Sequence, residues 1–113
     1  MPSSPALRLW APVVLWAAVI FVFSSIPALG TGLGVWDLVL RKIAHAIEFA
    51  VLGALLLRAL RAELPALAAG IAYAATDEVH QLFVEGRRGS VVDVLIDAVG
   101  VVAGVALWRR LRR

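Results

Sequence analysis

The chain has 113 residues, of which 62% are hydrophobic and only 17% are charged. An ordinary soluble domain is about half apolar and about a quarter charged, so this composition argues against a cytosolic enzyme and against a disordered chain. The chain contains no cysteine, which excludes disulfides and thiolate metal sites.

The basic residues lie at the edges of apolar segments rather than in one patch. The formal net charge is +3, but this distribution is typical of charges that flank membrane helices and not of a nucleic-acid-binding surface. The sequence therefore predicts a small all-α integral membrane protein with no nucleic-acid partner.

A first membrane helix is predicted over about 9–23, because residues 9–36 contain no charge and a crossing takes about 20 apolar residues. The later uncharged runs are too short to cross unless neighbouring ionisable residues lie inside the helices. Counting those residues predicts three more helices, over about 38–60, 64–84 and 91–108. The expected fold is one domain over 1–113, a four-helix bundle in which three helices carry charge at membrane depth.

Local signals support these boundaries. Asp37 and Ser90 are expected to cap the second and fourth helices, and Pro65 suits the first turn of the third. Turn-forming residues follow the first and third helices, at 24–34 and 85–89. A secretory signal peptide is the alternative interpretation of the N-terminal segment, although it has no clear Ala-x-Ala cleavage site.

The distribution of Lys and Arg predicts the orientation. With both termini in the cytoplasm, seven basic residues lie on the inner side: Arg8, Arg58, Arg61, Arg109, Arg110, Arg112 and Arg113. Four lie on the outer side: Arg41, Lys42, Arg87 and Arg88. Cytoplasmic loops carry the excess of basic residues, so this count favours cytoplasmic termini.

Ionisable residues gather at the outer end of the expected bundle. The second helix contributes His45 and Glu48, the third contributes Asp77, Glu78 and His80, and the fourth contributes Asp93 and Asp97. Residues three or four apart lie on the same face of a helix. Four pairs have this spacing: His45 with Glu48, Asp77 with His80, Asp77 with Gln81, and Asp93 with Asp97.

Gly100 and Gly104 continue the stripe of Asp93 and Asp97 and form a G-x-x-x-G surface for close helix packing. The polar face of the fourth helix is therefore also its packing face, and its carboxylates are expected to point into the bundle. A charge at mid-membrane costs about 2.5–3.5 kcal/mol. We therefore expect these carboxylates to line a wet cavity or to pair with the outer cations.

Structural roles are open for single members of this group. Ser90 and Asp93 can form a capping box, Glu78 can form a structural salt bridge, and Ser24 and Ser25 can end the first helix. A histidine alone is more often a hydrogen-bonded packing residue than a functional one.

Three segments resemble the signatures of the VanZ-like family. They are residues 41–49 (RKIAHAIEF, followed by Leu52-Gly53), residues 77–87 (DEVHQLFVEGR) and residues 93–100 (DVLIDAVG). Residues 23–27 are similar to the polar end of that family's first helix. Phe49 and Glu85 depart from the usual tyrosine and proline, so a tyrosine hydroxyl cannot be essential at position 49. The resemblance implies a multi-pass protein of the bacterial cytoplasmic membrane, in a group named for low-level teicoplanin resistance, but it implies no particular reaction.

The residues leave four functions open, and they do not decide whether the protein is an enzyme. In the first, Lys42 and Arg87 bind an anionic envelope lipid or peptidoglycan precursor, and an acid–base cluster beside it performs hydrolysis or group transfer. That cluster comprises His45, Glu48, Asp77, His80 and Asp97, with Gln81 and Asp93 as further binding residues.

The second function is a non-catalytic module that binds or shields such precursors from antibiotics. In the third, the five cluster residues hold a divalent metal such as Zn, Mn or Fe. The fourth, a proton or ion pathway, is disfavoured because the cytoplasmic half of the bundle has no polar relay. A bundle this thin is compatible with a homodimer.

Overall fold

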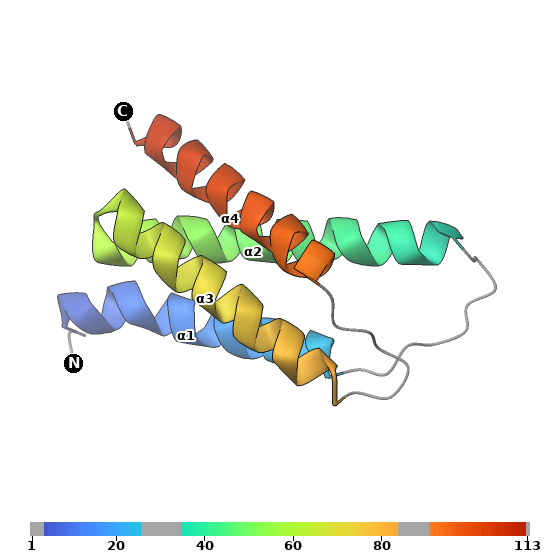
Figure 1. The fold of residues 1–113 in the computed structure, drawn as a ribbon. Helices are drawn as coiled ribbons and strands as arrows, with labels where there is room; N and C mark the ends of the chain where they lie inside the picture. Colours follow the sequence, from blue (N-terminus) through green and yellow to red (C-terminus); the bar gives the residue numbers. More distant parts are fainter. Residues whose placement is uncertain (1–3, 26–34, 84–90, 113) are drawn as a thin grey trace.

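The structure, a computed structural model, describes residues 4–25, 35–83 and 91–112. These residues form four helices, α1 (Pro5–Ser24), α2 (Val35–Leu60), α3 (Glu63–Gln81) and α4 (Val91–Leu111), and no strand (Figure 1). The predicted all-α four-helix bundle is confirmed. The first residues of α1 and the last of α4 lie at the same end of the bundle (Figure 1).

The helix ends differ from the predicted ones by a few residues. α1 begins at Pro5 because the Ser4 side chain accepts a hydrogen bond from the Leu7 N–H at 3.1 Å and proline suits the first turn. The prediction that Asp37 caps the second helix is wrong, since α2 begins at Val35 and Asp37 lies inside it. Pro65 lies in the first turn of α3, as predicted. Ser90, residues 26–34 of the first expected turn segment and all of the second, 85–89, lie outside the described residues.

Three of the described helices are long and apolar enough to cross a membrane. They are Pro5–Ser24, Val39–Leu60 and Val91–Leu111. α3 is not among them, and it carries acidic residues near both ends, Glu63 at its start and Asp77 and Glu78 towards its finish. The candidate spans are therefore in α1, α2 and α4, and membrane insertion of α3 stays a prediction.

The backbones of α2 and α4 approach each other closely where they cross, because glycines lie at the contact. A Cβ atom added to Gly104 would lie 1.8 Å from the Ala50 carbonyl oxygen, and one added to Gly100 would lie 2.3 Å from the Ala46 carbonyl oxygen. Gly53 of α2 makes the matching approach from the other helix, with its added Cβ 2.5 Å from the Val101 carbonyl oxygen. The predicted packing face of the fourth helix is confirmed, and Asp97 on that face is buried.

Aromatic side chains with polar tips attach α1 to its neighbours. The Trp16 indole N–H donates to the Glu48 carbonyl of α2 at 2.8 Å. The Tyr73 hydroxyl of α3 donates to the Ala17 carbonyl of α1 at 2.5 Å. Because each bond gives a partner to a part-buried donor group inside an apolar bundle, the two bonds hold α1 against α2 and α3.

Candidate functional site

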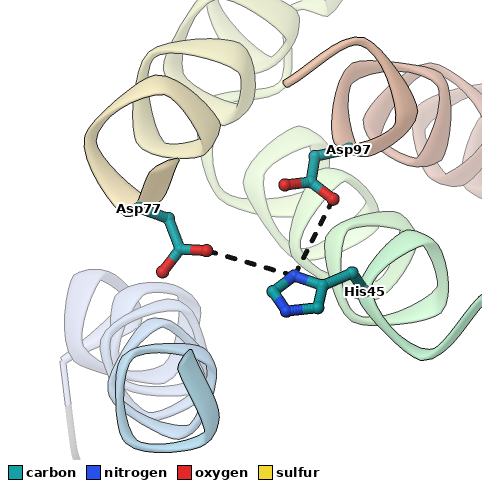
Figure 2. Close-up of side chains that lie close together, drawn as sticks. All are labelled: His45, Asp77 and Asp97. Carbon is teal, nitrogen blue, oxygen red and sulfur yellow. Dashed lines mark ion pairs between the residues drawn. The ribbon is translucent and has the colours of Figure 1, made fainter. Parts of the chain in front are cut away.

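A buried polar centre lies where α2, α3 and α4 meet (Figure 2). His45 Nδ1 is 4.0 Å from Asp77 Oδ2 and 3.8 Å from Asp97 Oδ1. It is also 3.9 Å from Glu48 Oε2, one turn further along α2. One imidazole nitrogen thus faces three carboxylates contributed by three helices. We call His45, Glu48, Asp77 and Asp97 the His45 centre.

The members of the His45 centre differ in burial. The side chains of Asp77 and Asp97 are 1% and 3% exposed, whereas those of His45 and Glu48 are each 17% exposed. Ionised carboxylates this deeply buried are costly unless they are paired or bound to a cation. Any carboxylate that is ionised in this centre therefore requires a nearby positive charge, on the imidazole or on a bound cation.

The close α2–α4 contact explains why Asp97 lies beside His45. Asp97 precedes Gly100 by one turn, and Gly100 packs on Ala46, the neighbour of His45. Phe49 lies one turn beyond His45, fully buried, with its ring centroid 6.4 Å from that of His45. The small residues bring the two backbones together, and the aromatic ring closes the apolar side of the centre.

Gln81 contacts the other nitrogen of His45. Gln81 Nε2 lies 3.3 Å from His45 Nε2, so Nδ1, rather than Nε2, is the nitrogen that faces the carboxylates. A partner on the second ring nitrogen sets the orientation of a histidine side chain. The sequence prediction that Gln81 belongs to this region agrees with its position.

Lys42 and Asp93 form an ion pair between α2 and α4, one turn from His45 and Asp97 towards the start of each helix. Both side chains are partly exposed. The expected pairing of the polar stripe with an outer cation is thus seen at Lys42. The ammonium group of Lys42, a predicted anion-binding residue, contacts the Asp93 carboxylate. Arg87, the second predicted anion-binding residue, lies outside the described residues.

His80 lies on the α1 side of α3 rather than beside His45 Nδ1. Its Nε2 is 2.8 Å from Ser25 Oγ, and its ring stacks on Phe21 with the centroids 4.3 Å apart. Ser25 Oγ also donates to the Phe21 carbonyl at 2.8 Å, so the expected helix-end role and a histidine contact occur together. A spacing of three residues places Asp77 and His80 on one broad face, but the two side chains meet different helices.

Three residues near the centre, Trp16, Phe21 and Tyr73, were not predicted from the sequence. Trp16 and Tyr73 could have been found as aromatic residues with a polar group inside otherwise apolar segments. Phe21 has no such signal, since it is one of many apolar residues in α1. Ser24 is fully buried, and its hydroxyl has no hydrogen-bond partner within the described ranges.

Three members of the centre could hold one metal ion. The ligand atoms of His45, Asp77 and Asp97 all lie within 4.8 Å of one another. Nitrogen and oxygen ligands that share one ion at about 2.0–2.2 Å are roughly 3–3.5 Å apart, so the side chains would close in slightly on binding. Mixed imidazole and carboxylate ligands suit Zn, Mn or Fe. Of the five predicted ligands, Glu48 lies beside this group, and His80 lies with Ser25.

Comparison with known proteins adds a family match. The VanZ/LLP1 family model matches residues 9–112. The chain is 44% identical over 71 residues to a protein of Bacillus subtilis (strain 168) named "Uncharacterized membrane protein YwnJ". That match covers 63% of this chain and 50% of the relative, so it spans half of the relative's length. No solved structure matches the chain.

Proposed function

This chain belongs to the VanZ/LLP1 family, and we propose that its His45 centre binds a divalent metal ion that holds an anionic envelope lipid or peptidoglycan precursor. One observation carries the proposal: His45 Nδ1 lies within 4.0 Å of carboxylate oxygens from Glu48, Asp77 and Asp97. In this proposal the protein is a multi-pass component of the bacterial cytoplasmic membrane.

The distances favour a shared cation over direct hydrogen bonds. A nitrogen and a carboxylate oxygen that share a proton are about 2.7–3.2 Å apart, whereas the shortest separation here is 3.8 Å. The ligand atoms of His45, Asp77 and Asp97 lie within 4.8 Å of one another, so one ion could contact all three. A divalent ion offsets the charge of the buried carboxylates and, when bound, polarises a phosphoryl or carbonyl oxygen of a ligand.

The location of the centre suits a ligand that arrives from one membrane surface. The partly exposed Lys42–Asp93 pair lies one turn nearer the end of the bundle than His45 and Asp97. The uneven distribution of basic residues supports the assignment of that end to the outer surface. A protein that binds envelope precursors there would change their availability to glycopeptides, which links the proposal to the resistance for which the family is named.

Metal analysis of the purified full chain tests the proposal. After purification without chelators, we expect about one Zn, Mn or Fe ion per chain in the wild type. His45→Gln and Asp97→Asn should retain about a tenth of that amount or less, because each removes a ligand. Glu63→Gln is the matched control, since Glu63 is a carboxylate in an ion pair at the opposite end of the bundle.

Wild-type protein that contains no metal and takes up none of Zn, Mn and Fe on titration would overturn the metal assignment. Circular dichroism in detergent shows whether each variant retains its helical content. Glu48→Gln provides a second test at a more exposed carboxylate of the centre, and we expect it to weaken metal binding while the chain stays folded.

A further inference from the structure

A second polar site lies at the other end of the bundle. A cavity of about 730 Å³ is lined there by Arg58, Arg61, Arg109 and Arg112, by Glu63, and by apolar side chains that include Trp108. Arg58 follows His45 by 13 residues, which is about 20 Å along α2. This is the end at which α1 begins and α4 finishes (Figure 1). We call it the arginine cavity.

The arginine cavity has a strong excess of positive charge. Four arginines and one glutamate line it, which gives a formal net charge of +3. Glu63 pairs with Arg109 at 2.7 Å, and the Arg112 guanidinium lies 5.8 Å from the centre of the Trp108 ring. Among the described residues, no ion pair involves Arg58 or Arg61, so these two cations are available to an anionic ligand.

The backbone at Arg61 supports a role for its side chain. Arg61 directly follows the last residue of α2 and has a φ of 59°, and its N–H donates to the Leu57 carbonyl at 2.8 Å. This left-handed conformation after a helix normally belongs to glycine, because a Cβ atom is unfavourable there. An arginine at such a position carries a conformational cost that glycine would avoid, and it places a guanidinium at the cavity.

We propose that the arginine cavity binds the headgroup phosphate of an anionic phospholipid. Guanidinium groups bind phosphate through paired hydrogen bonds, and basic pockets between membrane helices are suited to anionic lipid headgroups. Leu9, Leu57 and Trp108 supply an apolar wall beside the arginines, as the glycerol and acyl portions of a lipid require. One end of each candidate span, α1, α2 and α4, lies here, where a lipid headgroup would lie beside membrane-crossing helices.

The nature of the headgroup follows from the charge. A zwitterionic lipid would bring a cationic amine into a cavity with a net charge of +3, whereas phosphatidylglycerol carries a negative phosphate and no cationic group. The volume lies within the range of about 300–1,000 Å³ that is typical of small-ligand sites. The ligand class is therefore a phospholipid with net negative charge.

Titration calorimetry of the full chain in maltoside micelles tests this proposal with three probes: short-chain phosphatidylglycerol, short-chain phosphatidylcholine and inorganic phosphate. We expect phosphatidylglycerol to bind about ten-fold more tightly than the other two. Arg58→Gln and Arg61→Gly should each weaken its binding about ten-fold, the effect of losing one charge-assisted hydrogen bond. Arg110→Gln is the matched control, because Arg110 is an exposed arginine that does not line the cavity.

Arg61→Gly separates binding from folding. Glycine relieves the left-handed backbone, so this variant should unfold at the same temperature as the wild type or higher while it loses lipid affinity. Equal binding of both lipids, or an equal loss in Arg110→Gln, would reduce the site to a general positive surface. Inorganic phosphate that binds as tightly as the lipid would identify a free-anion site instead. None of these outcomes changes the metal content of the His45 centre.

Discussion

His45 and His80 belong to the same end of the bundle but have different partners. His45 Nδ1 faces carboxylates from three helices, whereas His80 pairs with Ser25 and stacks on Phe21. Residues that share one site lose function as a unit, and residues with separate partners lose it independently. Coupling within the His45 centre should therefore be stronger than coupling between this centre and His80.

At the residue scale we predict that Asp77→Asn and Asp97→Asn together have no larger effect than either change alone. Each removes a charge from the same group around His45 Nδ1, so the second loss adds little. The measurement is glycopeptide susceptibility of cells that express each variant in equal amounts in the membrane. His80→Gln serves for comparison and should add its own effect to that of Asp97→Asn. Wild-type susceptibility in both single variants would mean that the centre is structural only.

The geometry of the His45 centre depends on the close contact between α2 and α4. Glycine is needed at Gly100 and Gly104 because the carbonyl oxygens of Ala46 and Ala50 occupy the space of a Cβ atom. These obstacles are backbone atoms, which cannot rotate away as a side chain can. A larger residue therefore forces the helices apart and carries Asp97 away from His45.

At the element scale we predict that Gly104→Ala destabilises the folded bundle by about 1–3 kcal/mol or more, as overpacking of a tight contact does. The free energy of unfolding in mixed micelles measures the effect, and metal content should fall with it. Ala103→Val is the control, because Ala103 is exposed on the same helix. A Gly104→Ala protein as stable as the wild type would show that the two helices can separate at little cost.

Two polar sites lie at opposite ends of the bundle, and the segment between them is apolar. The His45 centre and the Lys42–Asp93 pair lie towards one end, and the arginine cavity lies at the other. Between them, α1 and α4 expose large apolar side chains such as Leu15 and Val99. This arrangement suits a molecule that lies across a bilayer with a different polar ligand at each surface.

At the scale of the molecule we predict that both termini and the arginine cavity face the cytoplasm. Because the chain has no cysteine, single cysteines can report on each side. Cysteine in place of Ala62, between α2 and α3, should react with an impermeant thiol reagent only after lysis. Cysteine in place of Gly32 or Gly89, outside the described residues, should react in intact cells. The reverse pattern would place the His45 centre at the inner surface.

The sequence by itself determined the number and type of the helices and the packing face of α4. These properties depend on local patterns: uncharged length, a spacing of three or four residues, and glycine at every fourth position. The same patterns indicated that His45, Asp77 and Asp97 belong to one end of the bundle. Helix ends were less well determined, because Ser4 caps α1 ahead of the apolar run and α2 extends before Asp37.

Only the tertiary structure decided which of those polar residues meet. The distance between side chains on different helices depends on where the helices cross and how each is rotated, and neither is encoded in local spacing. Asp77 and His80 share a face of α3, yet one meets His45 and the other meets Ser25. The arginine cavity is a result of the same kind, since Arg58 and Arg61 come together with Arg109 and Arg112 only when α4 returns to the end of α2. Sequence patterns predict on which face and near which end of a helix a residue lies. The crossing of the helices then determines which of these residues are in contact.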